Sequence, residues 1–217
     1  MKVGFIGLGN VGAKLAGSVL RNGFDLTVRD LDSSATGEFS RLGAHVANSP
    51  KELAERCDAI ITCLPSPRIS ASVMEDEDGV LAGLSEGNIW IEMSTTDQQE
   101  VLRLGALVSE RGAFAADCPV SGGCHRAATG NIAIFAGCDR IVFDAVFPLL
   151  GAMGRRVLHT GPLGTASILK VVTNYLATAN LVSICEALVT TETTGIDLAT
   201  AYEAIKISSG NSFVHET

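Results

Sequence analysis

Short apolar runs alternate with helical patterns along most of the chain. Residues 2–6 form an apolar run that ends in glycines, apolar residues then recur at helical spacing up to residue 20, and a second apolar run covers residues 26–28. This order predicts a βαβ unit. Further strands are expected near residues 58–63, 88–91, 113–117, 132–135 and 157–158. Because helical segments separate most of these strands, we expect a Rossmann-type α/β fold, with a doubly wound, largely parallel sheet covered by helices on both faces.

The pattern changes after residues 161–164, which read Gly-Pro-Leu-Gly. One long helix is predicted from about Thr165 to Thr194 and a second from about Asp197, a plausible N-cap, to about Ile207. We therefore expect a sheet domain over residues 1–162 and the start of an all-helical domain over residues 163–217. About 55 residues are few for an independent core, so this helical domain is expected to be incomplete and to be completed by another chain, most simply in a homo-oligomer.

Composition and charge narrow the classes of partner. The net charge is −8 and no cluster of Lys and Arg is present, so nucleic-acid binding is not expected. The long apolar helix is interrupted by Lys, Asn and Glu residues, which suits a buried interface helix better than a membrane span. Since the first strand begins at about residue 2, leaving no room for a signal peptide, a cytoplasmic location is expected.

Six cysteines lack the spacing of a metal site or a disulfide framework. No CxxC pair or Cys/His ligand spacing occurs, so we expect no metal and mainly reduced, buried thiols.

A glycine-rich loop follows the first predicted strand. It reads Gly7-Leu8-Gly9-Asn10-Val11-Gly12 and leads into the first helix. Gly7 permits a tight turn, Gly9 lets backbone N–H groups approach a pyrophosphate, and Gly12 lets helix and strand pack closely. Because both flanking elements fit, the loop predicts a dinucleotide-binding site.

A carboxylate at the end of the second strand sharpens this prediction. Asp30 lies where an acidic side chain accepts hydrogen bonds from the adenosine ribose and repels a 2′-phosphate. Arg29 is expected on the opposite strand face, so we predict NAD rather than NADP as the cofactor. In the alternative interpretation, Asp30 only caps the turn over residues 30–33.

A second loop follows the strand expected at residues 113–117. Ser121 offers a hydroxyl, and Gly122 and Gly123 leave backbone N–H groups open to an oxyanion such as a substrate carboxylate. A plain turn is the alternative. His125 and Arg126 come directly after it, either as selectors of an acidic substrate group or as a solvated pair.

Lys170 is a lone cation in an apolar helical segment. A desolvated lysine has a lowered pKa and makes a good proton shuttle, whereas a lysine that reaches the helix surface has no such role.

These stretches, taken in order, make the chain similar to the β-hydroxyacid dehydrogenase family, which includes 3-hydroxyisobutyrate dehydrogenase, tartronate semialdehyde reductase and, more distantly, 6-phosphogluconate dehydrogenase. The stretches that carry the resemblance are residues 7–12, Leu64-Pro65, Ser94-Thr95, residues 117–123, residues 161–170, and Lys170 with Asn174.

The resemblance implies a role for each group of residues. The loop of residues 7–12 and Asp30 would hold the adenosine half of NAD, and the path toward the nicotinamide would be lined by Leu64, Pro65 and Thr95. Ser121, Gly122 and Gly123 would hold the acidic group of the substrate. Lys170 would be the general acid/base, and Asn174, one helical turn further on, would orient the substrate hydroxyl or carbonyl.

The chain departs from the family pattern in three places. Ala166 replaces a usual glycine, Thr173 replaces a usual asparagine or histidine, and family members usually continue for several helices beyond Thr217. The expected function is NAD-dependent oxidation of a short 3-hydroxy acid, or reduction of the corresponding semialdehyde. The alternative is a catalytically silent dinucleotide-binding or assembly module.

Overall fold

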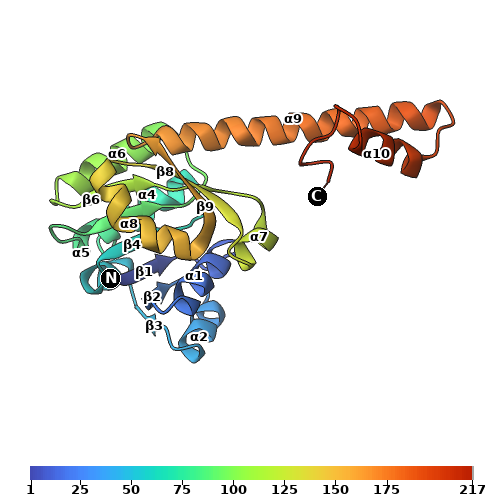
Figure 1. The fold of residues 1–217 in the computed structure, drawn as a ribbon. Coiled ribbons are helices and arrows are strands. Elements are labelled where there is room, and N and C mark those ends of the chain that lie inside the picture. Colours follow the sequence, from blue (N-terminus) through green and yellow to red (C-terminus); the bar gives the residue numbers. More distant parts are fainter. Residues whose placement is uncertain (217) are drawn as a thin grey trace. The chain divides into compact units, whose positions relative to one another are not determined.

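The computed structural model describes residues 1–216, which form two compact units (Figure 1). The first unit covers Met1–Lys170 and the second begins at Val171. The division falls inside a continuous helix, α9 (Thr165–Thr193), which starts in the first unit.

A nine-stranded sheet forms the centre of the first unit. Its strands are β1 (Lys2–Ile6), β2 (Asp25–Arg29), β3 (His45–Val46), β4 (Ala59–Thr62), β5 (Ile89–Glu92), β6 (Phe114–Asp117), β7 (Val120–Ser121), β8 (Ile132–Gly137) and β9 (Gly154–Gly161). The strand order is β3-β2-β1-β4-β5-β6-β8-β7, and β9 pairs with β8. All pairs are parallel except β6 with β8 and β7 with β8, which confirms the predicted largely parallel sheet.

Helices cover both faces of this sheet (Figure 1). They are α1 (Gly12–Arg21), α2 (Ser33–Arg41), α3 (Pro50–Arg56), α4 (Pro67–Glu75), α5 (Val80–Gly83), α6 (Gln98–Ser109), α7 (Cys124–Ala128) and α8 (Arg140–Met153). One hydrophobic cluster joins the sheet to α1, α2 and α8, and a second joins it to α3, α4, α5 and α6. The two clusters confirm the doubly wound arrangement predicted from the alternating pattern.

Two short strands were not expected. β3 and β7 have two residues each, which is too short for an alternation of apolar and polar positions to be recognised. Ser121 therefore lies in a strand antiparallel to β8, at a place where the sequence allowed a simple turn.

The second unit contains the rest of α9 and α10 (Leu198–Lys206). Asp197 caps α10 as predicted, because its carboxylate accepts from the backbone N–H of Thr200 at 2.9 Å. The chain then folds back, and His215 stacks on Tyr202 with ring centroids 4.2 Å apart. This contact gives a local structural role to His215.

Helix α9 is unusually exposed within the described chain. Its buried side chains are Ala166 and Ser167, both near its start. By length and composition alone α9 could cross a membrane, although the core helices of soluble proteins, which are mostly buried, pass the same test. That α9 is an interface helix stays a prediction.

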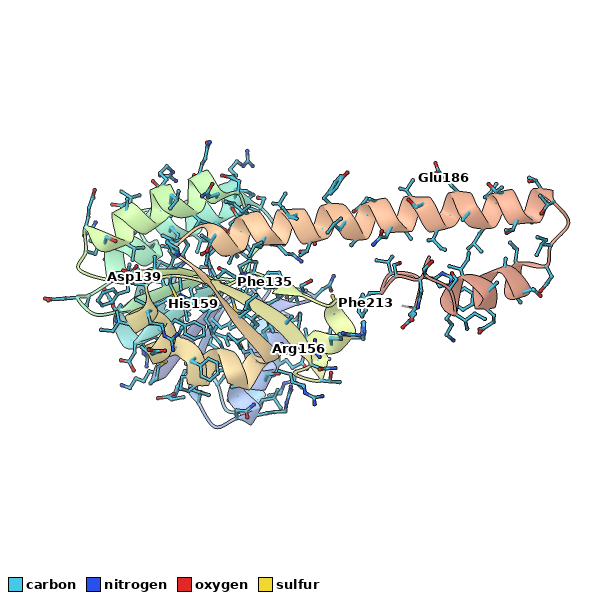
Figure 2. The ribbon with its side chains drawn as sticks, turned by 45° about the horizontal axis from the view of Figure 1, so that its top comes forward. Phe135, Asp139, Arg156, His159, Glu186 and Phe213 are labelled. Atoms are coloured by element: carbon cyan, nitrogen blue, oxygen red, sulfur yellow. The ribbon has the colours of Figure 1, made fainter. Side chains whose placement is uncertain are left out.

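The structure also shows the burial of the six cysteines and the contacts of His159. All six cysteines are free thiols; Cys57, Cys118 and Cys138 are buried and Cys63 is half-buried, which agrees with the expectation of mainly buried thiols, whereas Cys124 and Cys185 are exposed. His159 of β9, labelled in Figure 2, bonds the carbonyl of Cys138 at 2.8 Å through Nε2 and packs on Phe143.

Candidate functional site

A cavity of about 930 Å³ lies at the carboxyl ends of β1, β2, β4 and β5. Ligands of doubly wound sheets bind at this edge. Nine of the ten residues predicted to hold a cofactor line the cavity: Gly7, Gly9, Asn10, Val11, Gly12, Asp30, Leu64, Pro65 and Thr95. The tenth, Leu8, has a buried side chain and donates its backbone N–H to Asp30 Oδ2 at 2.5 Å.

The three glycines of the loop differ in what a side chain would meet. Gly7 has a φ of +97°, and a Cβ there would overlap the carbonyl oxygen of Cys63. A Cβ on Gly12 would overlap the carbonyl oxygen of Gly7. Gly9 has no heavy atom within 4 Å of its Cβ position, so its face of the loop is open to a ligand. The loop is therefore built to bring backbone close to a bound group, as a pyrophosphate requires.

Asp30 is held in place by two backbone donors. Its Oδ2 accepts from Leu8, and its Oδ1 accepts from the N–H of Asp32 at 2.9 Å. The second bond is the turn-capping contact that the sequence allowed as an alternative. Since each carboxylate oxygen has two acceptor positions and Asp30 lines the cavity, the same side chain can also accept from a ribose hydroxyl.

The alternation of side chains along β2 predicted that Arg29 would point away from Asp30 and the cavity. This prediction is wrong. Arg29 lines the same cavity as Asp30, and its guanidinium donates through Nη1 to the backbone carbonyl of Asp30. Strand alternation fixes the direction of Cβ, but a long side chain at a strand end can turn back toward the edge of the sheet. A positive charge therefore stands beside the carboxylate.

A hydrogen-bonded chain joins the loops that follow β4 and β5. The N–H of Leu64 donates to Ser94 Oγ at 2.7 Å, and the N–H of Ser94 donates to Glu92 Oε1 at 2.7 Å. Glu92 is buried, and desolvation raises its pKa. Glu92 was not among the residues predicted for the site; its signal in the sequence is an acidic residue at the end of an apolar strand.

Asp117 anchors the start of α9. Its Oδ1 accepts from the N–H of Gly164 at 2.9 Å, and its Oδ2 accepts from the N–H of Ser167 at 2.7 Å. The carboxylate thus satisfies N–H groups that have no partner within the helix. Burial raises the pKa of Asp117, and these hydrogen bonds oppose that shift.

The predicted substrate loop lies beside the cavity and not on it. Val120 lines the cavity, whereas Ser121, Gly122 and Gly123 do not. Gly122 and Gly123 have φ values of +131° and +81°, a backbone conformation that other residues rarely adopt. His125 and Arg126 follow in the short helix α7 and are outside the cavity lining.

Lys170 lies near the start of α9, as the last residue of the first unit. It is half-buried, and desolvation lowers its pKa, as expected for a proton shuttle. Asn174 lies four residues further along α9, in the second unit, and is exposed.

The glycine loop, the carboxylate that ends β2 and the cavity at the sheet edge together define a Rossmann-type dinucleotide-binding domain. A family model described as the NAD binding domain of 6-phosphogluconate dehydrogenase matches residues 2–161. A second, described as NAD-binding of NADP-dependent 3-hydroxyisobutyrate dehydrogenase, matches residues 164–217.

Curated relatives and a solved structure agree with these matches. The chain is 34% identical to mitochondrial 3-hydroxyisobutyrate dehydrogenase of Rattus norvegicus, over 99% of this chain and 64% of the rat protein. It is 32% identical to 2-(hydroxymethyl)glutarate dehydrogenase of Eubacterium barkeri, over 100% and 72% of the two chains. The structure of Mycobacterium tuberculosis 3-hydroxyisobutyrate dehydrogenase with L-serine superimposes with a TM-score of 0.91 at 27% identity, covering 98% of this chain and 72% of that one.

The chain therefore belongs to the β-hydroxyacid dehydrogenase family, as its motifs indicated. It spans 64% of the length of the rat relative. Its sheet domain is an NAD-binding domain, and the residues that line the cavity fit NAD because the open Gly9 face and the Asp30 carboxylate suit a pyrophosphate and a ribose.

Proposed function

We propose that the protein catalyses NAD-dependent oxidation of a short 3-hydroxy acid, similar to 3-hydroxyisobutyrate, to its semialdehyde, or the reverse reduction. The observation that carries this proposal is Lys170, a half-buried lysine with a lowered pKa in a chain that also has an NAD site. A module that only binds NAD has no need of such a lysine.

The proposed chemistry needs one proton acceptor from the protein. NAD, when bound, takes the hydride from the carbinol carbon. Lys170, in its neutral form, removes the hydroxyl proton as the carbonyl forms, and in reduction the ammonium returns this proton. Burial supports this role because it shifts the lysine toward the neutral amine.

Substrate binding is assigned to the residues that the family resemblance implies. Ser121, Gly122 and Gly123 hold the acidic group of the substrate, and Asn174 orients the oxygen that loses or gains the proton. The positive φ values of both glycines support this role, since such backbone can direct N–H groups toward an anion. His125 and Arg126 are the residues that we expect to tune the choice of acidic group.

Asp30 is proposed to favour NAD over NADP. Its carboxylate is fixed by Leu8 and Asp32, so it cannot easily turn away from a 2′-phosphate. Arg29 lowers this repulsion, but its guanidinium is bonded to the Asp30 carbonyl. Titration with NADH and NADPH tests the preference: we expect tighter NADH binding, and tighter NADPH binding would contradict the assignment.

The relatives suggest 3-hydroxyisobutyrate and L-serine as substrates to test, and D-glycerate and sulfonated analogues widen the range. NADH formation is to be measured with 3-hydroxyisobutyrate, L-serine, D-glycerate and sulfonated analogues, on this chain and on a form extended to the length of the relatives. We expect turnover with at least one short 3-hydroxy acid. Absence of turnover in both forms, with NADH binding retained, would favour the silent dinucleotide-binding module.

We also propose the location of the protein and its state of assembly. We expect a cytoplasmic homo-oligomer in which the apolar side chains of α9 are covered by another copy, because many of them are exposed here. Nucleic acid is not an expected partner of a chain with a net charge of −8.

A further inference from the structure

Buried polar residues form one rung across the carboxyl end of the sheet. Thr62 of β4 pairs with Glu92 of β5, and Glu92 pairs with Asp117 of β6. Each of the three is at most 1% exposed. Asp117 caps α9, and Thr62 accepts from the indole N–H of Trp90 at 2.9 Å. Glu92 neither lines the cavity nor takes part in the proposed reaction.

Glu92 links two loops that line the cavity. Its Oε1 fixes the backbone of Ser94, and the hydroxyl of Ser94 fixes the backbone of Leu64. Ser94 and Leu64 lie 30 positions apart in the sequence but both line the cavity. One buried side chain therefore fixes the position of the loop after β4 relative to the loop after β5.

An acid at this position is costly for the fold. The preceding residues Ile89, Trp90 and Ile91 are apolar and buried, and desolvation raises the pKa of Glu92, opposed by Ser94 and by the hydroxyls of Ser70 and Thr62. An apolar residue would avoid this cost, but it would leave the N–H of Ser94 without its acceptor. The contribution of Glu92 is therefore to hold the two loops in place and not to stabilise the core.

We propose that Glu92 is a positioning residue for the nicotinamide half of NAD, acting through Ser94 on the loops that present Leu64, Pro65 and Thr95. The inference rests on the proposed orientation of NAD, in which the adenosine half lies against residues 7–12 and Asp30. It assigns Glu92 no contact with the cofactor.

The test compares two ligands that differ in the nicotinamide. NADH carries the nicotinamide ring, whereas ADP-ribose has the adenosine, the pyrophosphate and the second ribose but no nicotinamide. Calorimetric titration of the full chain is to be carried out on the wild type, Glu92→Leu and Glu92→Gln. Val108→Ala is the matched control, because Val108 is buried in the same hydrophobic layer as Trp90 but lies at the end of α6 away from these loops.

We expect Glu92→Leu to raise the Kd of NADH about tenfold and to leave the Kd of ADP-ribose within about twofold. Glu92→Gln keeps an acceptor for Ser94 and is expected to bind NADH within about threefold of the wild type. Val108→Ala is expected to lower the melting temperature without changing the ratio of the two constants. Ser94→Ala removes the middle link with less disturbance, so a selective loss of about threefold or more is expected even if Glu92→Leu folds poorly.

Two results would overturn the role of Glu92. One is an equal loss of affinity for NADH and ADP-ribose in Glu92→Leu and Ser94→Ala, which would indicate only a contribution to stability. The other is unchanged affinity for both ligands. A wild type that binds ADP-ribose and NADH equally well would instead contradict the proposed placement of the nicotinamide, and with it the role of Glu92.

Discussion

Substitution of the loop glycines by alanine separates two contributions of the glycine loop, one to folding and one to cofactor binding. In Gly12→Ala the new methyl group would overlap the carbonyl oxygen of Gly7 and would come within 3.4 Å of the Phe5 ring. Helix α1 and the loop would have to move apart. In Gly9→Ala the methyl group meets no protein atom within 4 Å, and the backbone there has no positive φ.

The expected magnitudes follow from these contacts. Overpacking at a buried site costs about 1–3 kcal/mol, so Gly12→Ala is expected to lose this much unfolding free energy and also to bind NADH more weakly. Gly9→Ala is expected to stay within about 0.5 kcal/mol of the wild type. Its methyl group would occupy the open face, so its affinity for NADH should fall at least tenfold, or about 1.4 kcal/mol.

Chemical unfolding and NADH titration of the same preparations measure both quantities. Gly37→Ala is the control, because Gly37 lies in the helix α2 with nothing within 4 Å of its Cβ position. It should gain about 0.5–1 kcal/mol and bind NADH unchanged. A Gly9→Ala variant that binds NADH like the wild type, or that unfolds as readily as Gly12→Ala, would contradict these roles of the two glycines.

Four further predictions concern buried or charged groups. Asp30→Asn should improve NADPH binding relative to NADH about tenfold in parallel titrations, and an unchanged ratio would remove Asp30 from cofactor selection. In Asp117→Asn an NH₂ group replaces one of the two carboxylate oxygens that accept from the N–H groups of Gly164 and Ser167. One of these hydrogen bonds is lost, so the unfolding free energy should fall by about 1–3 kcal/mol. Because the pKa of Glu92 is raised in the folded state, its contribution to stability is complete below its ordinary value of 4.5 and is lost as pH rises through the raised value. Between these two pKa values, the free energy of unfolding of the wild type should therefore fall relative to that of Glu92→Gln by up to about 1.4 kcal/mol per pH unit. Denaturant unfolding at successive pH values measures this fall. Lys170 must be neutral to accept a proton, so the rate of oxidation should rise with pH and level off below 10.5; a plateau reached only above 10.5 would contradict a lowered pKa.

Most of the elements could be predicted because each of these has a local signal. The central strands β1, β4 and β5 are apolar runs flanked by turn residues, and α9 is a stretch without glycine or proline that stops before Gly195, whose φ is +81°. β7 could not be predicted, since a two-residue strand is defined by its partner β8 and not by its own sequence.

The cofactor residues could be predicted because the glycine loop is contiguous and its context is local. Arg29 and Glu92 could not, for two different reasons. The position of Arg29 depends on how a long side chain turns at a strand end, and the role of Glu92 depends on the register that brings Leu64 and Ser94 together. Neither the direction of a long side chain nor a contact between segments 30 positions apart leaves a pattern in a single sequence.

The measurement that tests the proposed function most directly is the rate of hydride transfer in Lys170→Ala, followed as NADH formation on the form that turns over a 3-hydroxy acid. Lys170→Arg is the control, since it keeps a positive charge that does not deprotonate. We predict that both variants bind NADH with wild-type affinity while turnover falls by orders of magnitude, roughly 10²–10⁴-fold. Turnover close to that of the wild type in Lys170→Ala would contradict the assignment of Lys170 as the general acid/base.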